Sequence, residues 1–137
     1  MTDAALIAKK LAFIETCVAE LRSLAKPAAI ESDVRERRFV EHTLQLAIQA
    51  ATDVASHVVS ENRLGEPRTN KELFDLIARA GWVSPDLAAA LRRMTGFRNI
   101  LVHGYTAVDP AVVRDVVENR LGDLERLVAS IRGRLVE

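Results

Sequence analysis

The spacing of apolar residues constrains the fold more than any other feature of this sequence. Apolar side chains recur every three or four positions along three long stretches, which is the period of one face of an α-helix. The three stripes are Ile7, Leu11, Ile14, Val18, Leu21 and Ala25; Val40, Leu44, Ala47, Ala51, Val54 and Val58; and Val113, Val117, Leu121, Leu124, Val128, Ile131 and Leu135. Because all three have the helical period, we predict an all-α fold without strands.

Local signals place the boundaries of the first two helices. The first helix covers about residues 3–25, and Pro27 stops it. The second helix opens between residues 31 and 33, with Ser32 as its N-cap, and continues to about residue 61.

Three further start signals follow along the chain. Thr69, with a glutamate three residues later, is typical of a capping box and predicts a short third helix that ends before Gly81. An N-capping side chain followed by proline occurs at residues 84–85 and again at 109–110. These pairs predict a fourth helix over residues 85–103 and a fifth that runs to near the C-terminus. Five helices joined by brief polar loops predict an antiparallel helical bundle, one domain over residues 1–137.

Composition narrows the class of protein. The 137 residues are 49% hydrophobic, which is enough for a hydrophobic core that needs no stabilisation by disulfide bonds or a structural metal ion. Nineteen basic against nineteen acidic residues give zero net charge, which excludes a histone-like polycation. The single cysteine, Cys17, excludes an internal disulfide, and its apolar surroundings predict a small core residue. No stretch is long and apolar enough to span a bilayer and no signal peptide is apparent, so we expect a cytoplasmic protein.

One segment, residues 96–105, carries a concentration of chemically useful side chains. Asn99 and His103 are four apart and share a helix face, while Arg98 lies about 140° from His103 around the helix. His103 falls in the last turn, where unpaired carbonyls favour an imidazolium that can act as a general acid. Arg98 offers a planar fork of donors for a phosphate. The sequence contains no zinc-binding histidine spacing and no phosphate-binding glycine loop, so we predict neither a metal nor a cofactor.

Spacing alone leaves a plainer interpretation open. An arginine paired with a surface carboxylate and a histidine that satisfies a helix C-terminus would explain Arg98 and His103 without any function.

The run from Arg98 to Tyr105 resembles the R-N-x-x-x-H-x-Y signature of the HepT-like branch of HEPN domains. The similarity extends to the segments 47–57, 69–81, 94–97 and 120–124, in order, and covers roughly residues 6–135. The resemblance implies a HEPN-like four-helix core with an additional short helix.

The resemblance also implies an activity: a metal-independent ribonuclease that is the toxin of a toxin–antitoxin pair. Arg98, Asn99 and His103 would be catalytic, in a composite cleft at a homodimer interface. The implied partner is a minimal nucleotidyltransferase antitoxin that adenylylates Tyr105, and the implied substrate is RNA.

Asp53 and His57 of the second helix are candidates for a supporting role at the site, and their spacing has two interpretations. Asp53 and His57 are four apart and predict a local hydrogen-bonded pair. Alternatively, as the family's acidic second-helix residue suggests, the Asp53 carboxylate lies in the cleft and orients His103 or Arg98.

Other charged residues are expected at the surface. His42 and the run 35–38 are expected to be solvated, whereas Arg92 and Arg93 are candidates to extend a phosphate-binding surface. A second function, a non-catalytic module that binds the nucleotidyltransferase and presents substrate or nucleotide to it, also fits the near-neutral charge.

Overall fold

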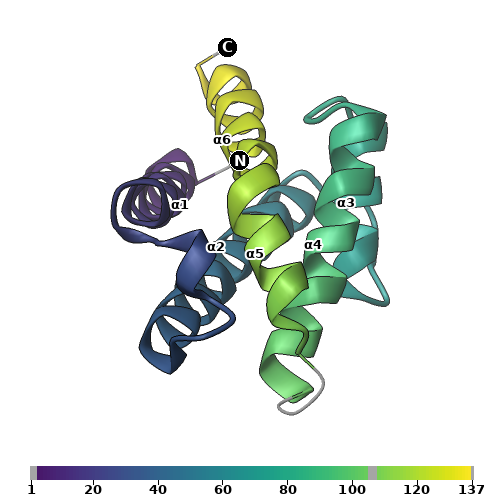
Figure 1. The fold of residues 1–137 in the computed structure, drawn as a ribbon. Coiled ribbons are helices and arrows are strands. Elements are labelled where there is room, and N and C mark those ends of the chain that lie inside the picture. Colours follow the sequence, from purple (N-terminus) through teal and green to yellow (C-terminus); the bar gives the residue numbers. More distant parts are fainter. Residues whose placement is uncertain (1–2, 105–107, 137) are drawn as a thin grey trace.

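The computed structural model describes residues 3–104 and 108–136, which form six α-helices and one short 3-10 helix (Figure 1). The elements are α1 (Ala4–Leu24), η1 (Pro27–Ala29), α2 (Val34–Glu61), α3 (Asn70–Arg79), α4 (Pro85–His103), α5 (Pro110–Asn119) and α6 (Leu121–Leu135). These residues contain no strand, so the all-α prediction is confirmed for them.

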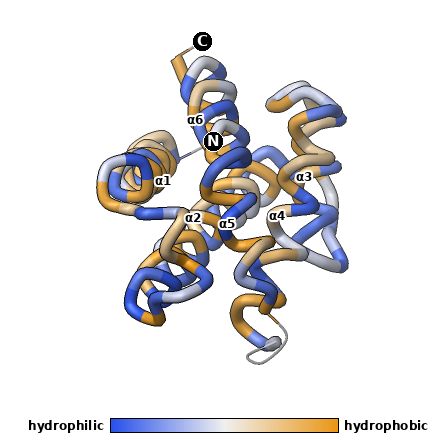
Figure 2. The backbone as a smooth tube through the Cα atoms, viewed as in Figure 1, coloured by the Kyte–Doolittle hydropathy of each residue, from blue (hydrophilic) through white to orange (hydrophobic). Residues whose placement is uncertain are grey.

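Helix α2 lies at the centre and packs against all five other α-helices. The fully buried alanines Ala47, Ala51 and Ala55 leave room for neighbouring helices to approach closely. The three predicted apolar stripes form the core, apart from Ala25 and Leu135, which are half-buried. Figure 2 shows the resulting alternation of apolar and polar residues around each helix. Burial of the stripes therefore determines which face each helix turns inward.

A tight connection orients α4 antiparallel to α3. Gly81 has a φ of +83°, and the N–H groups of Gly81 and Trp82 donate to the carbonyls of Ala78 and Ile77. This Schellman pattern ends α3 just before the predicted Gly81. The Ser84 hydroxyl then accepts from the Leu87 N–H at 3.2 Å, so α4 begins at the predicted proline.

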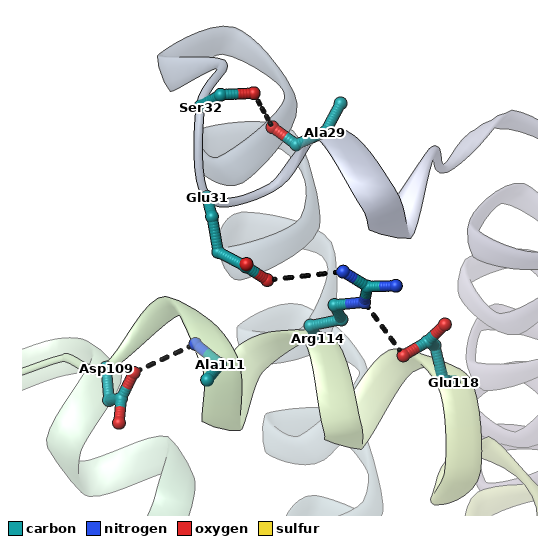
Figure 3. A network of polar contacts seen from close by, with 7 residues as sticks. All are labelled: Ala29, Glu31, Ser32, Asp109, Ala111, Arg114 and Glu118. Carbon is teal, nitrogen blue, oxygen red and sulfur yellow. Dashed lines mark hydrogen bonds and ion pairs between the residues drawn. The ribbon is translucent and has the colours of Figure 1, made fainter.

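The start of α2 differs from the prediction. Asp33, and not Ser32, is the N-cap: its Oδ1 accepts from the N–H groups of Arg35 at 2.9 Å and Glu36 at 3.4 Å. Ser32 instead donates its hydroxyl to the carbonyl of Ala29 (Figure 3). The short helix η1, which was not predicted, turns the chain here and places Asp33 at the capping position.

The predicted fifth helix is wrong in one respect, because it is two helices. They meet at Arg120, whose φ of −116° and ψ of −3° depart from helical values. α5 packs on α2 and η1, whereas α6 packs mainly on α1 and also on α4, and one straight helix would not reach both sets of neighbours. The apolar stripe continues across the break, so its periodicity does not indicate a helix end at Arg120. Asn119 and Gly122 are both weak helix formers and are the local signal for the break.

Helix α5 is tied to the start of α2. Arg114 reaches Glu31, in the turn before α2, at 3.6 Å and Glu118, one helical turn further along α5, at 3.0 Å (Figure 3). Asp109 caps α5 as predicted, accepting from the Ala111 N–H at 2.9 Å. These contacts fix the two segments that flank the end of α4.

Two smaller predictions can be compared with the structure. Cys17 is 2% exposed, as expected of a core residue, and burial raises the pKa of its thiol. In the described part of the chain no helix is long and apolar enough to cross a bilayer.

Candidate active site at the end of α4

The last two turns of α4 reach beyond its partner helix α3. Lys71, at the start of α3, places its Nζ 3.4 Å from the position that a Cβ on Gly96 would occupy. The segment Phe97–His103 continues α4 past this point, near the start of α5 (Figure 1). Figure 2 shows much of its last turn as hydrophobic.

The predicted catalytic residues lie on two sides of this segment. Arg98 follows the buried Met94 by four residues and is half-buried, so its position faces the bundle. Asn99 and His103 are exposed and share the solvent-facing side. The structure therefore confirms that Asn99 and His103 share a face, and it places Arg98 beside that face.

Arg98 is unusual among the charged residues. Its Nε is buried and has no hydrogen-bond partner among the described residues. Folded proteins pair most buried donors, since an unpaired one costs about 1–3 kcal/mol. Arg98 also forms no ion pair with any described residue. The plainer interpretation, in which Arg98 pairs with a surface carboxylate, is therefore not found among these residues. Arg98 therefore has a buried donor that no described residue satisfies.

His103 lies in the last turn of α4, as predicted. The end of α4 is closed by the backbone, because the Gly104 N–H donates to the Ile100 carbonyl at 2.8 Å. A Cβ on Gly104 would lie 2.9 Å from that oxygen, so a side chain does not fit without a backbone shift. Tyr105 lies outside the described residues.

Asp53 and His57 do not form the predicted local pair. The Asp53 carboxylate accepts from Gln49 Nε2 at 2.9 Å and pairs with Lys10 Nζ at 3.4 Å, which ties α2 to α1. His57 is half-buried on the same helix. Within one chain, neither side chain is hydrogen-bonded to Arg98, Asn99 or His103 in the parts described. One partner of Asp53, Gln49, lies one turn away on α2, whereas the other, Lys10, lies on α1, and no local pattern in α2 reveals it.

The arginines before the motif have different roles. Arg92 is exposed and forms an ion pair with Asp75 of α3 at 3.3 Å. Arg93 lines a groove between α4 and α5 with Phe97 and Val112. Over residues 3–104 and 108–136, no three metal-ligating side chains gather.

Sequence reasoning missed a groove beside the end of α4. This groove, about 580 Å³, is hereafter the α2–α4 groove, and it is lined by Arg37, Arg38, Glu41, His42, Gln45, Leu101 and Val108. Arg38 and His42 are exposed, as predicted, but they face the groove rather than open solvent alone. The spacing of four between Arg38 and His42 indicates that they share one face of α2. The sequence does not indicate which helix packs opposite that face, so the groove was not predicted.

Comparison with known proteins identifies relatives over most of the chain. The family described as Ribonuclease HepT-like matches residues 14–131. The mRNA nuclease HepT of Shewanella oneidensis is 28% identical over 128 residues, which are 93% of this chain and 96% of that protein. The tRNA nuclease HepT of Aphanizomenon flos-aquae is 31% identical over 105 residues, 77% of this chain and 71% of that protein.

Solved structures give the same picture. The tri-AMPylated HEPN toxin of Shewanella oneidensis, in complex with its MNT antitoxin, superposes with a TM-score of 0.88. It is 28% identical, and the match covers 97% of this chain and 99% of that one. The Bacillus subtilis protein YutE, at 18% identity, shares the fold with a TM-score of 0.88.

Proposed function

Because this chain belongs to the HepT-like ribonuclease family, we propose that it is an RNA endonuclease that acts as the toxin of a toxin–antitoxin system. The observation that carries this proposal is the half-buried Arg98, whose Nε has no partner among the described residues, beside an exposed Asn99 and His103. A relative described as an mRNA nuclease and a toxin structure in complex with an antitoxin support it.

The proposed reaction consists of two proton transfers and one displacement at phosphorus, with side chains of the protein supplying the catalytic groups. A base removes the proton of a ribose 2′-OH, and the oxygen attacks the adjacent phosphorus. Arg98 stabilises the negative charge that develops on the phosphoryl oxygens, and His103 protonates the departing 5′-oxygen. Asn99 orients the imidazole or binds a sugar hydroxyl. The products are a 2′,3′-cyclic phosphate and a 5′-OH end, and no metal takes part.

We further propose that a homodimer completes the site. One chain supplies a single His103, and a two-fold dimer supplies two imidazoles, one for the base and one for the acid. Ile100 is 49% exposed and Val112 46% exposed. Phe97, which lines the α4–α5 groove with Val112, precedes Ile100 by one turn on α4. Apolar side chains beside Asn99 and His103 favour contact with a second copy.

Control by a minimal nucleotidyltransferase antitoxin would act at Tyr105. This residue is two positions from His103, so an added adenylyl group brings a bulky anion next to the cleft. The anion repels RNA phosphates, and inhibition requires no refolding. Replacing Tyr105 with phenylalanine should keep the nuclease activity and abolish its inhibition by the antitoxin, as measured by RNA cleavage with and without antitoxin and ATP.

The alternative, a non-catalytic module that presents substrate or nucleotide to the nucleotidyltransferase, is favoured by the zero net charge. Expression of the wild type and of His103→Ala in a sensitive host, followed by mapping of RNA ends, separates the two functions. We expect cyclic-phosphate ends with the wild type, also in extracts with EDTA, and none with His103→Ala. Equal toxicity of the two proteins, or no cleavage by the wild type, would leave the non-catalytic module as the function.

A further inference from the structure

The arginines of the α2–α4 groove belong to those that form no ion pair with a described residue. Arg22, Arg114 and Arg132 each pair with a carboxylate on another segment. Arg37 and Arg38, by contrast, make no ion pair with any described residue, although Glu41 lies beside them in the groove. Two unpaired guanidinium groups and an imidazole therefore share the groove with a single carboxylate.

The charge of these cations does not stabilise the helix that carries them. Arg37 and Arg38 are the fourth and fifth residues of α2, near the positive end of its dipole, whereas basic side chains are favourable at the other end. Glu36, the acidic residue between Arg35 and Arg37, is engaged elsewhere, accepting from the Lys26 N–H at 2.8 Å. The cluster is therefore not explained by helix stability, and its charges are available for contacts from outside the bundle.

The groove borders the turn of α4 that carries Arg98, although its described lining does not include Asn99 or His103. Leu101, which forms its α4 wall, follows Arg98 by three residues, so the two positions are neighbours on the helix surface. Leu101 and Val108 give one wall apolar side chains, while Gln45 and His42 offer hydrogen-bonding groups on the other. Cations, polar groups and an apolar wall together match a single nucleic-acid strand, which has a phosphate backbone and apolar base faces.

We propose that the α2–α4 groove binds the RNA strand flanking the scissile phosphate, with Arg37 and Arg38 on backbone phosphates and His42 and Gln45 on ribose or base edges. The inference rests on the proposed ribonuclease function and extends it from the reacting phosphate to a binding subsite. It also explains how a chain of zero net charge attracts a polyanion, since the attraction is local.

The test compares two double variants of equal charge. Arg37→Gln with Arg38→Gln removes the groove cations, whereas Arg63→Gln with Arg79→Gln removes two exposed arginines that lie outside the groove and form no ion pair with described residues. Binding of a short fluorescein-labelled single-stranded RNA is followed by anisotropy over a salt series, in a His103→Ala background. The groove variant should bind about tenfold more weakly, and its salt slope should fall by about 0.7 for each phosphate that is no longer neutralised. The control pair should match the parent.

A second measurement separates binding from chemistry. On otherwise wild-type protein, the groove substitutions should lower kcat/KM for a long RNA and leave cleavage of a dinucleotide, which is too short to fill the groove, unchanged. Their thermal midpoint should be equal to or above that of the parent, since cations leave the positive end of a helix.

Three results would overturn the assignment: equal RNA affinity and salt slope for the two double variants, equal reductions on long RNA and dinucleotide, or a defect confined to binding of the nucleotidyltransferase. The last result would make the groove a protein-binding surface. If the wild type cleaves no RNA, the proposed function fails by itself, and the anisotropy contrast still decides whether the groove binds RNA.

Discussion

The two halves of α4 differ in how their polar groups are used. In the half that packs against α3, Ser84 caps the helix, Arg92 pairs with Asp75, and the Thr95 hydroxyl donates to the Leu91 carbonyl. In the half that follows Gly96, the Arg98 Nε is buried without a partner in the described chain and His103 is exposed. The first half contributes stability, whereas the second keeps polar groups available at some cost in stability. One helix thus combines a scaffold with a candidate site.

The largest expected effect tests the second half. Arg98→Met removes the charged fork and the unpaired buried donor while keeping most of the apolar volume. We expect cleavage to slow by about 10²–10³-fold, the usual loss for a group that stabilises transition-state charge. The free energy of unfolding, measured in urea, should be unchanged or higher by about 1 kcal/mol. A clear fall in stability would mean that Arg98 has a structural role, and the contrast between the halves would fail.

A core substitution in the first half should behave in the opposite way. Leu91 is 1% exposed, and Leu91→Ala should lower the free energy of unfolding by about 2–5 kcal/mol through reduced burial and a cavity. Cleavage per folded molecule, measured well below the unfolding midpoint, should stay near the wild-type value. A variant that is well folded but inactive would show that the site depends on exact packing in the first half.

The cap of α4 gives an intermediate effect. Ser84→Ala leaves the Leu87 N–H without its side-chain acceptor and should cost about 1 kcal/mol of unfolding free energy. Ser84→Asp serves as the matched control, since aspartate also caps helices, and it should restore most of the stability. Equal stability of Ser84→Ala and wild type would indicate that the proline and the turn alone fix the start of α4.

The smallest effect concerns pH and the body of the bundle. Arg132 donates to Glu15 at 2.7 and 3.1 Å, and this hydrogen bond lowers the pKa of the Glu15 carboxyl below 4.5. The pair therefore stabilises the fold at pH values above the pKa that Glu15 has in the unfolded chain. This contribution disappears as the pH falls through the lower pKa that Glu15 has in the folded protein. Because the pair is exposed, Glu15→Gln should cost only a few tenths of a kcal/mol at pH 7. The difference between wild type and variant should vanish in acid; a difference that persists would point to packing rather than charge.

Local signals allowed much of the fold to be predicted from sequence. Capping side chains followed by proline marked the starts of α4 and α5 correctly, because a cap acts within one turn. The break at Arg120 was missed, since the apolar stripe crosses it and the cause lies in different packing partners on either side. Long-range neighbours decide such features, and periodicity does not encode them.

The candidate site shows the same division. Arg98, Asn99 and His103 belong to one helix, so spacing placed them relative to one another. The Lys10 partner of Asp53 and the facing of His42 toward Leu101 both depend on which helices meet, and these were not predicted.

The close approach at Gly104 has a consequence for how such a protein can change. A Cβ there would lie 2.9 Å from the Ile100 carbonyl oxygen, so position 104 accepts a side chain only with a backbone shift. In the sequence this glycine stands between the histidine proposed for catalysis and the tyrosine proposed for modification. A substitution at position 104 would therefore disturb both the proposed RNA cleavage and its proposed inhibition, so the two properties constrain the same residue.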